Sequence, residues 1–161
     1  MKFYQFILAG LAGAALIAGL GFLFSRGQAA RLEGSITNVR TLGMDQNSSV
    51  ALVDFEAVNP SQVLMIVGRR ELAVVDEQGL TREGSTISAA DLKSLFQYFP
   101  ALGAMESDPM IDRVRVEPGQ MVSGMVAARF SIPKHQLDAS QDLVLRVHEV
   151  DGGISELRQA P

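Results

Sequence analysis

No charged residue occurs between Phe3 and Phe24, a run of 22 residues directly after Lys2. A helix rises about 1.5 Å per residue, so this run would span roughly 33 Å, close to the hydrocarbon thickness of a bilayer. A helix also satisfies its own backbone hydrogen bonds in lipid. We therefore expect residues 1–24 to form a transmembrane anchor. Its main apolar residues are Phe6, Ile7, Leu8, Leu11, Leu16, Ile17, Leu20, Phe22, Leu23 and Phe24.

A cleaved signal peptide is the alternative interpretation of this segment. Lys2 could form its charged start, and Gly27-Gln28-Ala29 resembles a cleavage site between small residues. Signal-peptide cores are typically about 7–15 residues long, so the longer run favours an uncleaved anchor. Cleavage would release a soluble exported domain, whereas an uncleaved anchor would leave residues 25–32 as a short linker.

The orientation of the anchor follows from what flanks it. Only two residues precede the run, and a long domain after an anchor translocates largely regardless of nearby charge. We expect a single-pass membrane protein whose residues 33–161 form an extracytoplasmic domain, periplasmic in a Gram-negative cell. Small residues four apart, such as Gly10 and Ala14, would let two anchors approach closely. A homodimer through the anchor is therefore an open alternative.

Composition limits what the domain after the anchor can be. All 18 acidic residues lie at or after Glu33, and the chain contains no cysteine. The missing thiols exclude disulfides and thiolate zinc sites. The acidic balance argues against nucleic acid as a partner, because such binders usually carry a clustered basic face.

Short apolar runs separated by turn residues recur through the domain and predict β-strands. The run at 50–58 alternates as a half-buried strand would, with Ala51, Val53 and Phe55 on one face. Asp151-Gly152-Gly153 predicts a tight hairpin. The expected strands are 36–42, 50–58, 63–67, 71–75, 110–116, 121–132, 143–150 and 154–157.

One helix interrupts the strands. Ser88 followed by Asp91 predicts a capping box, and Pro100 ends the helix after Phe99. The apolar stripe of this helix is expected to pack over the sheet. The alternative is a contact face for a partner, formed by Leu95, Tyr98 and Phe99.

These elements define the expected fold class. It is mainly β, with an N-terminal transmembrane helix followed by an antiparallel β-sandwich of immunoglobulin or fibronectin kind that carries one short inserted helix.

Catalytic chemistry has little support in the sequence. His135 and His148 are isolated, so neither a nucleophilic triad nor a zinc site is predicted. Acidic pairs lie at expected turns, where they serve solubility and turn formation. We therefore predict no catalytic, metal or cofactor-binding residues and a protein that is not an enzyme. A hydrolase that uses Glu149 and Asp151 is the alternative.

The segment from Val53 to Ser61, which ends in Asn59-Pro60, resembles the late embryogenesis abundant type 2 family, which includes water-stress domains. Leu72-Ala73-Val74-Val75 extends the similarity. The resemblance implies a membrane-anchored, bacterial-type variant with an immunoglobulin-type sandwich and no enzymatic activity. It also implies that Asn59 and Pro60 form a structural corner.

The sequence therefore predicts a non-enzymatic module for binding, scaffolding or stress protection close to the membrane. The expected partners are the membrane itself and an envelope protein or lipid. A subunit of a larger envelope assembly is the alternative.

Overall fold

The structure is a computed structural model of the chain, and it describes residues 30–159 together with residues 13, 15, 16 and 19. Of the expected anchor residues, Leu16 is described as helical and exposed, and the other nine lie outside the described residues. In the described part of the chain, no helix has both the length and the apolar character needed to cross a membrane. This finding corrects the expected single-pass membrane localisation and the extracytoplasmic placement derived from it.

The described residues after Ala30 form nine strands, two α-helices and one 3-10 helix. In chain order they are β1 (Glu33–Asp45), β2 (Ser48–Val58), β3 (Met65–Val75), β4 (Thr81–Glu83), β5 (Ser85–Thr86), α2 (Ala89–Tyr98), η1 (Pro100–Leu102), β6 (Arg115–Val116), β7 (Met121–Phe130), α3 (Lys134–Asp138), β8 (Asp142–Glu149) and β9 (Ile154–Gln159).

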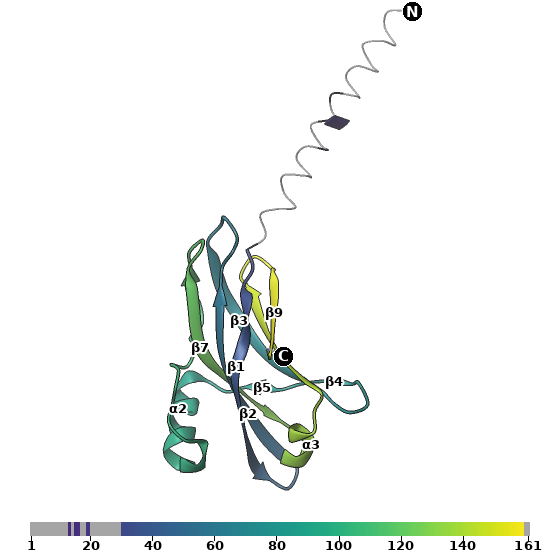
Figure 1. Cartoon of the computed structure of the whole chain (residues 1–161), viewed down its shortest axis with the longest axis vertical. Helices are drawn as coiled ribbons and strands as arrows, with labels where there is room; N and C mark the ends of the chain where they lie inside the picture. Colours follow the sequence, from purple (N-terminus) through teal and green to yellow (C-terminus); the bar gives the residue numbers. More distant parts are fainter. Residues whose placement is uncertain (1–12, 14, 17–18, 20–29, 160–161) are drawn as a thin grey trace, which may run out of the picture.

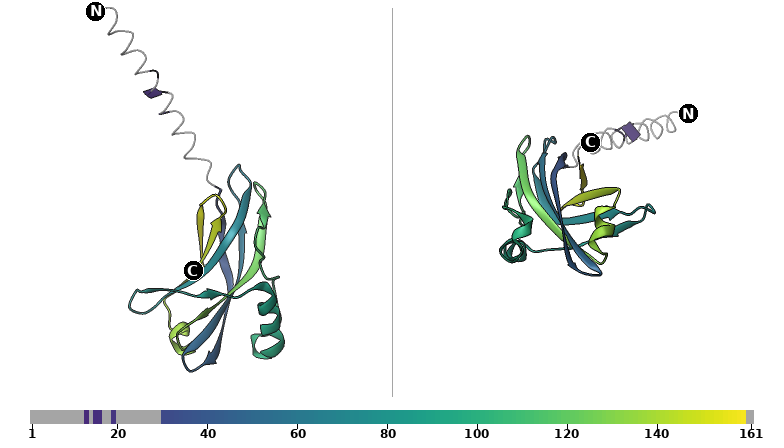
Figure 2. Two further views of the ribbon diagram at one scale, coloured as in Figure 1. Left: turned by 180° about the vertical axis from the view of Figure 1, so that it is seen from behind. Right: turned by 60° about the horizontal axis from the view of Figure 1, so that its bottom comes forward.

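The strands form one continuous sheet in the order β4-β3-β8-β9-β1-β2-β7-β5, with β6 beside β3. This sheet folds over on itself, so that β3 and β8 face β2 and β7 (Figures 1 and 2). The expected mainly β sandwich with an inserted helix is confirmed at this level. The expectation of purely antiparallel pairing is wrong, because β1 pairs with β9 in parallel through Ser35 and Ile36.

The main core fills the space between the two halves of the sheet and includes Phe55, Leu72 and Phe130, all essentially buried. Gly84 closes this core where the chain passes from β4, beside β3, to β5, beside β7. Its amide donates to the Leu72 carbonyl at 2.9 Å. An added Cβ would lie 2.7 Å from the Ala128 side chain, so the crossing requires glycine.

A second, smaller core lies on the outer face of β2 and β7, under α2 and η1. Its buried residues are Val50, Leu52, Leu92, Leu102, Met125 and Ala127. The expectation of a half-buried strand at 50–58 is therefore wrong, because β2 is buried on both faces. The expected cap of the covering helix is confirmed, since the Ser88 side chain accepts a hydrogen bond from the Asp91 amide at 3.1 Å.

Three other expectations are corrected. The runs expected at 63–67 and 71–75 form one strand, β3, which begins at Met65 and bulges between Val67 and Arg70. The segment 110–116 is mostly irregular and forms only the two-residue strand β6. The expected loop around His135 contains the short helix α3, which begins after Pro133.

Candidate binding surface

Asn59, expected at a structural corner with Pro60, is fully buried at the end of β2. Its side-chain amide donates to the carbonyls of Val63, at 2.8 Å, and Val116, at 2.9 Å. Its side-chain oxygen accepts from the Ser61 amide and hydroxyl at 3.0 and 2.5 Å. All of these contacts hold the backbone in place, so the geometry gives Asn59 a structural role.

The three residues of the expected contact face on α2 point in different directions. Leu95 and Phe99 pack against the second core, whereas the Tyr98 side chain is 78% exposed. Tyr98 is therefore the most accessible of the three, and Leu95 and Phe99 are partly buried.

The two histidines lie on separate parts of the sandwich. His148 on β8 places Nε2 3.0 Å from a carboxylate oxygen of Glu71, whose other oxygen pairs with Arg69 at 2.8 Å. Glu71 is therefore held between two neighbours on the outer face of β3. His135, 13 residues earlier in the chain, lies in the first turn of α3, where it lines a cleft.

Glu149 and Asp151, the acidic pair considered for catalysis, belong to the β8–β9 hairpin. Burial in this turn raises the pKa of Glu149, and the neighbouring Asp151 carboxylate raises it further. The hairpin accounts for both effects. Gly153 packs close to the Glu149 carboxylate and helps to bury it, and the turn brings the like charge of Asp151 near it.

We expect Glu149→Gln to stabilise the protein at pH 7 and to change its stability little at pH 3. The raised pKa means that the folded protein binds the proton more tightly than the unfolded chain does. Stability contributed by this group is therefore present below the ordinary pKa of 4.5 and is lost as the pH rises through the folded pKa. Urea unfolding at both pH values measures the difference. An equal gain at pH 3 and pH 7 would contradict this origin of the effect.

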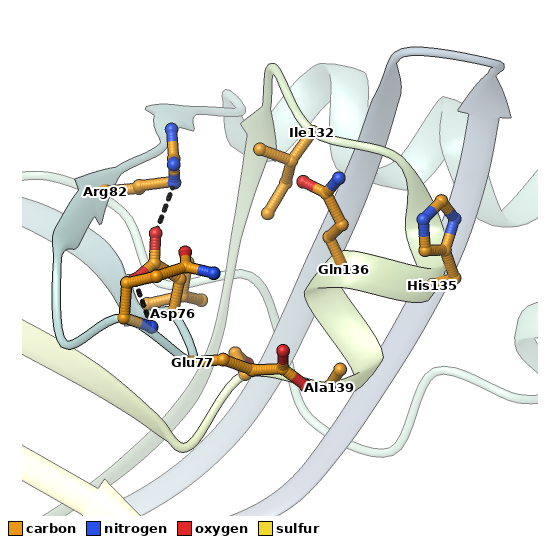
Figure 3. Close-up of a pocket in the computed structure, with 10 residues that line it drawn as sticks. Asp76, Glu77, Arg82, Ile132, His135, Gln136 and Ala139 are labelled. Atoms are coloured by element: carbon orange, nitrogen blue, oxygen red, sulfur yellow. Dashed lines mark hydrogen bonds and ion pairs between the residues drawn. The ribbon is translucent and has the colours of Figure 1, made fainter.

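Two clefts flank α3 at one end of the sandwich. The first, which we name the hairpin cleft, has a volume of about 420 Å³ and lies between α3 and the β3–β4 hairpin. Figure 3 shows Gln136 on α3 near Ile132, with Arg82 and Asp76 on the other side of the cleft. Its lining residues are Val74, Asp76, Glu77, Gln78, Arg82, Ile132, His135, Gln136, Ala139 and Ser140.

Asp76 is the only buried carboxylate in the hairpin cleft, and its oxygens serve the hairpin itself. One oxygen accepts from the amides of Gln78, at 3.0 Å, and Leu80, at 2.9 Å. The other accepts from Nε of Arg82 at 2.9 Å. These hydrogen bonds hold the pKa of Asp76 below its usual value, and the one from the Leu80 amide is the largest cause. This carboxylate is therefore suited to fixing a turn and is not suited to general base catalysis.

The second cleft, which we name the seam cleft, lies on the other side of α3 between β1 and the start of β8. It has a volume of about 440 Å³. It shares Ser140 with the hairpin cleft, so the two clefts adjoin. Its lining residues are Val39, Thr41, Leu137, Asp138, Ser140, Gln141, Asp142, Leu143 and Gln159.

The charged side chains of the seam cleft are the carboxylates of Asp138 and Asp142. Asp138 accepts from Lys134 and from the Thr41 hydroxyl, which lies at 2.6 Å. These two hydrogen bonds, with Lys134 the larger cause, hold the pKa of Asp138 below its usual value. Asp142 pairs with Arg158 of β9. Each of the two carboxylates is therefore held by a cationic side chain of the domain.

The two clefts around α3 offer apolar, amide and charged side chains to a bound molecule. In neither cleft does a hydroxyl form a hydrogen bond with a histidine that could activate it. Across the described residues, no group of three or more acidic or histidine side chains is placed to hold a metal ion.

Comparisons with known proteins place this chain in no family, since no family model and no curated protein matches it. Among solved structures, the archaellum periplasmic stator protein FlaG from Sulfolobus acidocaldarius is similar over 81% of this chain and 99% of its own, at 12% identity and a TM-score of 0.34. The complex of FlaF and FlaG from the same organism gives 11% identity, 81% and 90% coverage and a TM-score of 0.32.

An uncharacterised β-sandwich protein from Clostridium difficile 630 gives 11% identity, 80% and 85% coverage and a TM-score of 0.35. At these TM-scores the likenesses carry no argument about function. What the domain can bind is therefore argued from its own side chains and backbone.

The surface around α3 was not predicted from the sequence. A signal was present, because Pro133 can precede a helix and Lys134 and Asp138 have the spacing of an ion pair one helical turn apart. The opening between β1 and β8 has no such signal, since it depends on where β9 ends relative to β1.

Proposed function

We propose that this domain is a non-enzymatic module that binds a partner protein at the α3 end of the sandwich, as a subunit of a larger assembly. One observation supports the proposal above the others. The hairpin cleft and the seam cleft adjoin there. Three carboxylates that line them already have partners within the domain, and these are Asp76, Asp138 and Asp142.

The lining of the two clefts favours a protein partner. Apolar side chains such as Ile132 and Leu137 lie beside amides, carboxylates and a guanidinium, a mixture that protein interfaces share. The envelope assembly expected from the sequence is one setting for this role. The relationship to late embryogenesis abundant proteins, and the stress protection that it implies, stay predictions.

A photo-crosslinking amino acid at Gln136, in cells that express the full chain, tests this proposal. Gln136 is exposed on α3 and lines the hairpin cleft. We expect illumination to yield a discrete protein adduct, which mass spectrometry can identify. The matched control places the same amino acid at Glu117, which is exposed in the turn before β7. Adducts from Glu117 with none from Gln136 would overturn the proposal.

A further inference from the structure

The longest strand of the sheet, β1, is paired on both edges along only part of its length. On one edge, β2 pairs with it from Glu33 to Asp45. On the other edge, β9 pairs with it only at Ser35 and Ile36. Within the described residues, no strand follows β9 along β1 from Asn38 onward. An unpaired strand edge of this kind presents amide and carbonyl groups that can pair with another chain.

The seam cleft lies where β9 ends. Val144, near the start of β8, pairs with Arg158, near the end of β9. The start of β8 and the end of β9 therefore lie at about the same level of the sheet. In Figure 1, β1 and β2 continue past the end of β9 toward α3. Among the described residues, the cleft therefore lies beside β1 just beyond Gln159, the last residue of β9.

The accessible part of this edge runs from Asn38 to Thr41. Val39 and Thr41 line the cleft. Beyond them α3 covers the strand, since Thr41 hydrogen-bonds to Asp138 and an added Cβ on Gly43 would lie 3.4 Å from the Lys134 side chain. A strand of about four residues, or roughly 13 Å, could lie along this edge.

The lining of the cleft indicates which segment it would accept. Its apolar side is formed by Val39, which packs against the main core, with the core residues Leu137 and Leu143. Its charged residues, Asp138 and Asp142, are both acidic. Their partners Lys134 and Arg158 are about half exposed, and such surface pairs are worth little, so an incoming cation could compete for the carboxylates.

We propose that the seam cleft receives a short extended segment of a partner protein, which joins the sheet beside β1 in line with β9. Successive side chains of a strand point to opposite sides. Apolar side chains at alternate positions would face Val39, Leu137 and Leu143, and basic side chains between them would point to the opposite face of the sheet, where Asp142 lies. Backbone hydrogen bonds supply affinity in strand addition, and the alternating side chains supply specificity. This inference rests on the proposed function and names the mode of binding.

A capped six-residue peptide of alternating valine and lysine is the probe, and amide hydrogen exchange followed by NMR is the readout. We expect saturating peptide to slow exchange of seam-facing amides between Asn38 and Thr41 by at least about tenfold. A peptide of alternating valine and glutamate should not do so. Gln159→Trp, which places a bulky side chain at the cleft, should abolish the protection. The matched control Gln120→Trp changes an exposed residue before β7 and should retain it.

Each result supports or overturns the inference. Absence of protection, or equal protection in Gln159→Trp, would overturn it. Protection that rises with protein concentration alone would also overturn it, because a second copy of the chain would then occupy the edge. If the cross-link at Gln136 persists while the peptide fails, the binding mode is wrong and the proposed function stands. Loss of the Gln136 cross-link overturns the proposed function itself.

Discussion

Asn59→Ala is expected to lower the free energy of unfolding by about 3 to 5 kcal/mol, since each buried group left without a partner costs roughly 1–3 kcal/mol. The Asn59 side chain joins the end of β2 to Val63, just before β3, and to Val116 of β6. Alanine would remove the hydrogen bonds of the Val116 carbonyl and the Ser61 amide to this side chain, and it would leave the Val63 carbonyl only the Ser61 hydroxyl as a side-chain donor. Urea unfolding followed by circular dichroism measures the loss as a lower midpoint at an unchanged slope.

Ser61→Ala provides the matched control for Asn59. It removes one hydroxyl that hydrogen-bonds to the Asn59 oxygen and to the Val63 carbonyl, and it leaves the amide bridge to Val116 intact. A loss of about 1 kcal/mol is expected, as for a single hydrogen bond. If Asn59→Ala cost no more than Ser61→Ala, the bridge to Val116 would contribute nothing to stability.

The contacts of Asn59 separate what a local sequence pattern can predict from what it cannot. A strand that ends in Asn-Pro predicts a turn, because proline fixes φ and asparagine can satisfy turn amides. The contact with Ser61 is local and follows from this chemistry. The contact with Val116 joins residues 57 positions apart, and no periodicity in the sequence carries that information.

The sequence of β2 indicates burial on both of its faces, but its alternation alone predicts burial on one face. Ala51, Val53 and Phe55 face the main core as their alternation predicts. Val50 and Leu52 on the opposite face are also buried, because α2 covers them. The unbroken apolar run from Val50 to Val53 is typical of a strand covered on both sides. The capping box located the covering helix but not the surface that it covers.

The surface around α3 depends on chain placement that short-range patterns do not specify. The helix has only five residues, too few for a periodic apolar stripe to stand out. The seam cleft lies next to the parallel contact of β9 with β1, which among the described residues involves only Ser35 and Ile36 of β1. Strands such as β2, β7 and β8 were therefore predictable from local patterns, whereas the opening between β1 and β8 was not.

Arg40→Met is the other substitution for which we expect a large loss, about 3 to 5 kcal/mol, because it leaves a buried carboxylate without its counter-charge. The Arg40 guanidinium lies 2.7 Å from the Asp54 carboxylate, whose side chain is 4% exposed. It also donates to the carbonyls of Leu102, at 3.2 Å, and Ala104, at 2.8 Å. It stacks 5.2 Å from the centre of the Phe96 ring. One side chain therefore joins β1 and β2 to α2 and to the end of η1.

Hydrogen exchange separates this role from a general loss of stability. Because the contacts of Arg40 lead to α2 and η1, Arg40→Met should speed exchange between Leu92 and Leu102 more than in β3 and β8. The double variant Arg40→Met with Asp54→Leu removes both charges, and its stability should return close to that of the unaltered protein. If the double variant were as unstable as Arg40→Met alone, the cost would come from the lost contacts to Leu102, Ala104 and Phe96. The buried charge of Asp54 would then not be its cause.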